Sequence, residues 1–114
     1  MIRMIPERSI KLRQQAIEEL LTAIREYCES AQAIKTPGEY YEQYLLAKLY
    51  TKVRTRQFKM VDGGKLVTSM KFDIAEALLI ATIVTRSKAS VPLNQLLSEV
   101  GVMLPASIYK QFLV

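Results

Sequence analysis

The sequence has no histidine and only one cysteine, and these two scarcities remove whole classes of chemistry. Zinc sites of the Cys/His type need ligands that the chain does not carry. Nucleophilic catalysis by a Ser-His or Cys-His pair is excluded for the same reason. Cys28 has no second cysteine with which to form an internal disulfide, and we expect it to pack as a small hydrophobe on the apolar face of a helix. We therefore expect no metal site and no bound cofactor.

Long apolar runs are also missing. The longest, ALLIA at residues 77–81, is far shorter than the ~20 residues that span a bilayer. The first fifteen residues, MIRMIPERSIKLRQQ, are basic but contain no apolar segment of the kind found in secretory signals. Half of the residues are hydrophobic, and glycine and proline number only four each, so neither a disordered nor a fibrous chain is indicated. We expect one compact domain, residues 1–114, in the cytoplasm and without membrane contact.

The first half of the chain has the apolar spacing of two helices. From residue 7 to about residue 34, apolar side chains recur every three or four positions, which is typical of a long amphipathic helix. The sequence Thr36-Pro37-Gly38 ends this pattern. A second apolar row runs from Glu39 to about Arg56 and predicts a second helix, antiparallel to the first.

A turn is predicted at Asp62-Gly63-Gly64, because glycine accepts the positive φ that tight turns require. The flanking sequences QFKMV and KLVTSMKF alternate with the two-residue period of a strand. We therefore expect a β-hairpin at about residues 57–72. In an alternative interpretation, the second helix continues to Met60 and Gly63 is its C-terminal glycine.

The last third of the chain predicts further helices. Asp73 and Glu76 have the spacing of a capping box and mark the start of a helix at residues 74–87. This helix is apolar on nearly all sides, so it must be either central or part of an interface. Shorter helices are expected from Pro92 to Val100 and at about residues 105–112. The predicted fold class is mainly α, a compact helical domain of four to five helices with one β-hairpin between the second and third helices.

Positive charge is concentrated in the middle of the chain, which has a net charge of +5. One acid, Asp62, stands among seven basic residues, which are Lys48, Lys52, Arg54, Arg56, Lys59, Lys65 and Lys71. A group of this density can neutralise several phosphates and so attract nucleic acid. The nearby Tyr40, Tyr44 and Tyr50 offer stacking partners for exposed bases. The alternative is that these charges only keep the surface soluble.

Residues 93–112, LNQLLSEVGVMLPASIYKQF, resemble a helix-turn-helix, and more narrowly the pattern of the TetR family of DNA-binding proteins. The positions that carry the resemblance are Gly101, Val102, Ile108, Tyr109 and Phe112. The resemblance implies groove contacts by the exposed residues of the second helix, Ser107, Lys110 and Gln111. The spacing from Gly101 to Tyr109 is one residue longer than in the family, and Lys110 is the one basic residue of that helix. Two core helices joined by a glycine turn would produce a similar pattern.

These patterns indicate a small non-enzymatic nucleic-acid-binding protein that holds phosphates with the seven basic residues. The alternative is a self-assembling structural or adaptor protein, for example a helical component of a virion-like assembly, that forms a homo-oligomer or binds a protein partner. Its interface would comprise Ile80, Ile83, Phe112, Leu113 and Val114. An enzyme is not expected, because Glu39, Tyr41 and Glu42 cluster only as any exposed first helical turn does.

Overall fold

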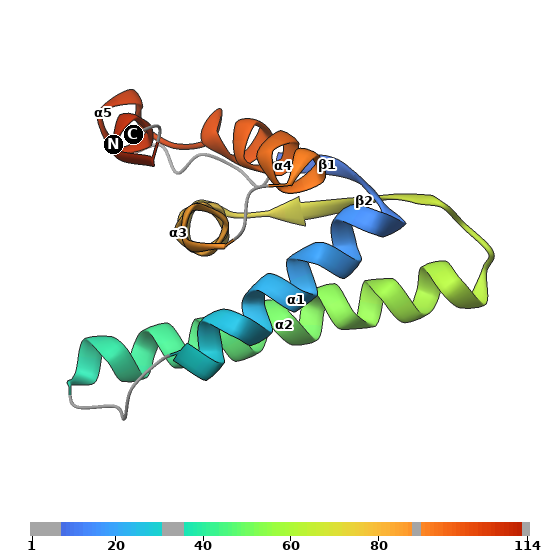
Figure 1. The fold of residues 1–114 in the computed structure, drawn as a ribbon, viewed down its shortest axis with the longest axis horizontal. Helices are drawn as coiled ribbons and strands as arrows, with labels where there is room; N and C mark the ends of the chain where they lie inside the picture. Colours follow the sequence, from blue (N-terminus) through green and yellow to red (C-terminus); the bar gives the residue numbers. More distant parts are fainter. Residues whose placement is uncertain (1–7, 31–35, 88–89, 113–114) are drawn as a thin grey trace, which may run out of the picture.

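Helices dominate the computed structural model (Figure 1). The structure describes residues 8–30, 36–87 and 90–112, and for Ser30, Tyr109 and Phe112 it describes the backbone alone. The elements in chain order are β1 (Arg8–Arg13), α1 (Gln14–Ser30), α2 (Pro37–Asp62), β2 (Val67–Phe72), α3 (Ile74–Arg86), α4 (Val91–Gly101), α5 (Ala106–Tyr109) and the 3₁₀ helix η1 (Lys110–Phe112). The two strands form one antiparallel sheet. The predicted fold class, a compact and mainly α domain of four to five helices, is confirmed, with five α-helices among the described residues.

The long helix α2 extends beyond the bounds that the sequence predicted. It begins where the Thr36 side chain accepts a hydrogen bond from the Glu39 backbone N–H at 3.1 Å. It continues through Asp62 and ends at Gly63, whose N–H donates to the Lys59 carbonyl at 3.0 Å. The alternative interpretation, with the helix running past Met60 to a glycine cap, is therefore correct. Residues 57–62, expected as the first strand of a hairpin, are helical because they complete the last turns of α2.

The partner of β2 comes from the other end of the chain. β2 lies within the expected range 57–72, but it pairs with β1, with Ile10 opposite Met70. Residues 8–13, expected at the start of the first helix, are thus a strand, and the helix begins only at Gln14. The sequence RSIKLR suits a strand because its apolar residues Ile10 and Leu12 alternate with polar ones and are both buried.

The apolar helix α3 is covered by the chain's own elements. The capping box at its start is present, since Asp73 and Glu76 each accept a hydrogen bond from the other's backbone N–H. Six of its thirteen residues are buried: Ala77, Leu79, Ile80, Ala81, Ile83 and Val84. α1 and α4 both pack against it. Of the two possibilities that the sequence left open, a central helix or an interface helix, α3 is therefore the central helix. The chain itself covers most of it, so no partner is needed.

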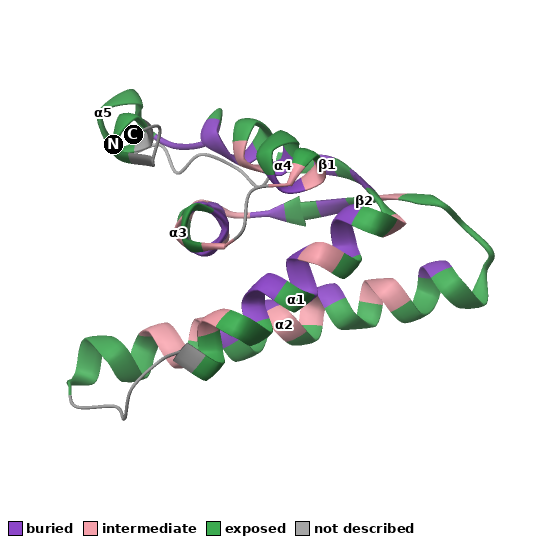
Figure 2. Ribbon diagram, in the orientation of Figure 1, coloured by how far each residue is buried: buried purple, intermediate pink, exposed green. Residues whose placement is uncertain are grey.

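Burial is uneven along α2. Only four of its 26 residues are buried, and Figure 2 shows that both ends of the helix are mostly exposed. On α1, the buried row ends at Ile24, and Cys28 is exposed because it lies beyond the part of α1 that faces the core. The expectation that Cys28 packs inside the core was wrong.

Candidate nucleic-acid interface

The outer face of the β1–β2 sheet is basic. Because side chains alternate along a strand, Ile10 and Leu12 turn toward the core while their neighbours turn outward. The outward residues are Ser9, Lys11 and Arg13 on β1, and Val67, Ser69 and Lys71 on β2, and all six are exposed. The register places Ser9 opposite Lys71 and Lys11 opposite Ser69. One face of six residues therefore presents three cations, two hydroxyls and no acid.

Two members of this face, Lys11 and Arg13, were absent from the predicted set of basic residues. Assigned to a helix, they would have been spread around its circumference. The signal that could have identified them is the alternation of basic and apolar side chains in KLR, which is a strand pattern.

A second row of cations follows one side of α2. Lys48, Lys52, Arg56 and Lys59 are spaced by four, four and three residues, which places them along the same side of a helix. Lys48 and Lys59 are exposed, whereas Lys52 and Arg56 are half-buried. This row therefore offers fewer free charges than its sequence suggests.

Lys52 joins the helix to the sheet. Its Nζ lies 3.1 and 3.0 Å from the two carboxylate oxygens of Glu76, donates to the backbone carbonyl of Lys71, and sits 5.1 Å from the centre of the Phe72 ring. The Glu76 carboxylate neutralises the Lys52 ammonium group. The N–H groups of that ammonium already donate to Glu76 and to the Lys71 carbonyl. Lys52 thus has a structural role here, and its ammonium group has little capacity left to contact a phosphate.

The remaining predicted cations do not all share this side. Arg54 follows Lys52 by two positions, so it lies on a different side of α2. Its guanidinium is 4.7 Å from the centre of the Phe58 ring and donates to Gln57 Oε1 at 3.3 Å. Lys65 is exposed in the segment after α2. The seven residues therefore form several groups, and of them only Lys71 lies on the sheet face.

The tyrosines near the start of α2 are open to solvent. Tyr40, Tyr41 and Tyr44 expose 67%, 61% and 57% of their surfaces. Tyr50, which was also expected to be available for stacking, is half-buried against the core. The accessible rings near the start of α2 are thus those of Tyr40, Tyr41 and Tyr44, rather than the set named from the sequence.

The C-terminal helix pair differs from a typical helix-turn-helix in its second element. α4 has eleven residues, but α5 has only four before the chain continues as η1. Ser107, Lys110 and Gln111 are exposed, as expected. Ile108, which would pack inward in a helix-turn-helix, is instead 36% exposed, because a helix of one turn is too short to bury an apolar side. The resemblance of residues 93–112 to a helix-turn-helix stays a prediction.

The residues proposed for an oligomer interface fall into two groups. Ile80 and Ile83 are 0% and 1% exposed in the core of this one chain, so they are not available to a partner. The side chain of Phe112 and the residues Leu113 and Val114 lie outside the described part of the structure.

Within the described ranges, no three His, Cys, Asp or Glu residues gather as metal ligands would. Among these same residues, no helix has the length and apolar character needed to cross a bilayer. Comparisons of the chain with protein-family models, with curated proteins and with solved structures found no match. The functional argument therefore depends on the geometry of the surface itself.

Proposed function

We propose that the chain is a non-enzymatic nucleic-acid-binding protein whose outer sheet face contacts the phosphate backbone. The observation that supports this most is the placement of Lys11, Arg13 and Lys71 on one exposed face that has no acid. Phosphate contacts come mainly from lysine, arginine and hydroxyl side chains, and this face supplies all three kinds. Lys48 and Lys59 on α2 are also exposed, and they belong to the same basic stretch of the sequence as Lys71, residues 48–71.

A two-stranded antiparallel ribbon is also a suitable shape for this role. The major groove of B-DNA admits such a ribbon, and some sheet proteins insert one there. Ser9 and Ser69, placed beside the cations, can donate hydrogen bonds to phosphate oxygens. Release of counterions by the cations provides affinity without base specificity, so the expected binding depends on charge more than on sequence.

The test is a salt titration of binding to duplex and single-stranded oligonucleotides. For the unaltered chain, log Kobs should fall linearly with log salt concentration. The double variant Lys11→Ala/Lys71→Ala should make the slope on B-DNA shallower by roughly 1.8, that is ~0.9 for each lost phosphate contact. The matched control, Arg25→Ala/Arg86→Ala, removes the same charge from exposed positions on α1 and α3 and should leave the slope nearly unchanged.

Two results would refute the proposal. One is the absence of any complex at about 50 mM salt, where phosphate contacts are strong. The other is an equal loss in both double variants, since that would show a response to net charge alone.

A further inference from the structure

Among the residues that the structure describes, no strand pairs with the edge of β1 that faces away from β2. Gln14 N–H donates to the Leu66 carbonyl at 2.9 Å, so the ladder bonds continue at alternate residues, Leu12, Ile10 and Arg8. The N–H and C=O groups of Ser9 and Lys11 must then point out of the opposite edge. The Lys71 carbonyl agrees with this alternation, because Lys71 is paired with Ser9 and accepts from Lys52 outside the sheet.

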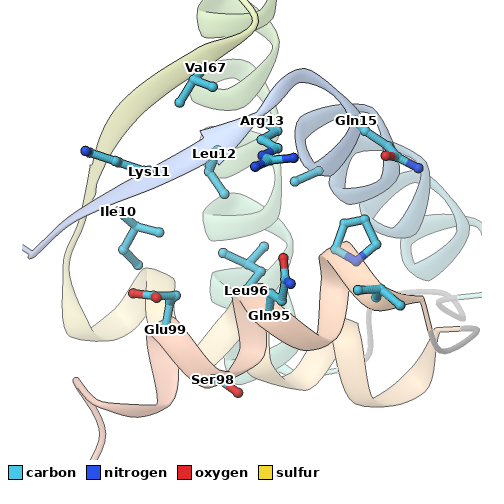
Figure 3. Close-up of a pocket in the computed structure, with 13 residues that line it drawn as sticks. Ile10, Lys11, Leu12, Arg13, Gln15, Val67, Gln95, Leu96, Ser98 and Glu99 are labelled. Carbon is cyan, nitrogen blue, oxygen red and sulfur yellow. The ribbon is translucent and has the colours of Figure 1, made fainter.

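A groove of about 820 Å³ lies along this edge, between β1 and α4 (Figure 3). Its β1 side runs from Ile10 to Arg13, and its α4 side includes Val91, Leu96 and Gln95. Figure 3 shows Leu96, Gln95 and Glu99 on the side of α4 that faces the strand. The groove thus combines an open strand edge, apolar side chains and a few polar groups.

We propose that this groove binds an extended segment of a partner protein, which adds to β1 as a third strand of the sheet. In strand addition, main-chain hydrogen bonds to an open edge give affinity, and pockets for alternate side chains give specificity. Ser9 and Lys11 supply the edge donors and acceptors. The groove beside α4 supplies space for those side chains of the added segment that face the core.

The chemistry of the segment follows from the two sides of the sheet. Its side chains on the outer side would lie beside Lys11 and Arg13, which favours acidic residues. Those on the inner side would meet the exposed Val91 and the half-buried Pro92 on the α4 side of the groove, which favours apolar residues. Glu99 also lines the groove, but its charge is offset by Arg8 at 3.8 Å. The best occupant therefore alternates acidic and apolar residues.

A second copy of β1 is a poorer occupant. The strand RSIKLR carries three cations and no acid, so pairing two copies would bring like charges together across the new ladder. Like charges directly opposite each other destabilise a sheet. Charge complementarity thus selects an acidic partner segment over self-association through this edge.

Binding can be tested with two synthetic eight-residue peptides, one alternating glutamate with valine and one alternating lysine with valine. Fluorescence anisotropy should detect the acidic peptide on the full chain at a concentration at least tenfold below that needed for the basic one. Amide hydrogen exchange at Ser9 and Lys11 should slow at least tenfold when the acidic peptide is bound. Equal binding of the two peptides, or unchanged exchange at these amides, would overturn the proposal.

Substitutions at the edge separate strand addition from simple charge attraction. Ser9→Pro removes an N–H that points out of the open edge of β1 and leaves the ladder bonds to β2 in place. Proline is tolerated at such a position on an edge strand. It should weaken peptide binding at least tenfold, whereas the matched Ser9→Ala should bind as the unaltered chain does. If the two variants bind equally, the edge is not the site. Circular dichroism on both variants ensures that only folded protein is compared.

Two further measurements separate this proposal from other occupants and from nucleic-acid binding. Lys71→Ala changes the outer face of β2, away from the groove, and should reduce peptide affinity less than twofold. A larger loss would mean that the peptide lies across the outer face instead. Light scattering that finds a dimer at tens of micromolar, converted to monomer by Ser9→Pro, would assign the edge to a second copy and refute the partner segment.

Discussion

Lys52 on α2 and Glu76 on α3 form an ion pair with the ammonium nitrogen 3.0 Å from one carboxylate oxygen and 3.1 Å from the other. The same carboxylate accepts from the Asp73 backbone N–H at 3.0 Å. Glu76 therefore caps its own helix and holds the long helix against it. The pair is partly shielded, with 34% of the Lys52 side chain and 17% of the Glu76 side chain exposed.

Removing either partner should destabilise the fold by different amounts. Lys52→Ala should lower the free energy of unfolding by about 1 kcal/mol, since it loses a half-exposed ion pair. Glu76→Ala should lower it by about 2 kcal/mol, because the helix cap is lost as well. Urea unfolding of the two single variants and the double variant measures their coupling, with Lys48→Ala as the exposed control on the same side of α2. A coupling energy of zero would contradict the role given to Lys52.

Burial of α3 within one chain predicts how substitutions there should act. Ile80→Ala should cost about 2 to 5 kcal/mol of stability, because it opens a cavity in the core. Leu78→Ala, at a position 41% exposed, should cost less than about 1 kcal/mol. Thermal unfolding at several protein concentrations would check both values. If the loss at Ile80 changed with protein concentration, α3 would have to contact another copy.

The turn after α2 depends on glycine at one position. Gly64 has a φ of 65°, a conformation that other residues rarely adopt, and nothing lies within 4 Å of an added Cβ. Gly64→Ala should therefore cost about 1 kcal/mol through backbone strain alone. Gly64→Asn should cost less, since asparagine tolerates this conformation better. Gly38→Ala is the control for chemical denaturation: its added Cβ would lie 3.9 Å from Thr36 Oγ1 in a helix, so this variant should not destabilise the protein.

The hydrogen bond from Tyr27 to Glu42 should make stability depend on pH in alkaline solution. Partial burial, and then the hydrogen bond to Glu42, raise the pKa of Tyr27 above its ordinary value of 10.0. A raised folded pKa means that the stabilisation is complete below pH 10 and is lost as the pH rises through the folded pKa. Tyr27→Phe should therefore cost about 1 kcal/mol at pH 7 and progressively less above pH 10. Urea unfolding at pH 7, 9 and 11 tests this, and a constant difference would disprove it.

The helices could be predicted because their signals are local. Thr36-Pro37 begins α2, the Asp73–Glu76 pair begins α3, and Ser90 caps α4 just before Pro92, each through side-chain or backbone chemistry within a few residues. β1 could not be placed in this way. Six residues with two apolar positions fit the start of a helix nearly as well as a strand, and the choice is made by Met70 and Phe72 far along the chain.

The same distinction applies to the candidate site. Counting charges in the sequence placed Lys71 in the basic region, and the structure shows that Lys71 is exposed. It could not reveal that Lys52 is occupied by Glu76, because that contact joins two helices. Nor could it bring Lys11 beside Lys71, since only the register of the sheet does so.

The pairing of β1 with β2 also sets an order of events during folding. The closest paired residues are Arg13 and Val67, so β1 has no partner until the whole of α1 and α2 has been made. At ~5–20 residues per second, a ribosome leaves β1 waiting for roughly 3 to 10 seconds. Closing this loop is entropically unfavourable, whereas the hairpin of α1 and α2 needs only nearby contacts and should form first. Leu20→Ala should then slow refolding, whereas Leu12→Ala should hardly change the refolding rate. Stopped-flow measurements would detect this difference. The reverse result would show that the sheet nucleates the fold. Until the ribosome has released β2, the basic face of the ribbon does not exist, so a nascent chain would have its helices before it had its proposed binding surface.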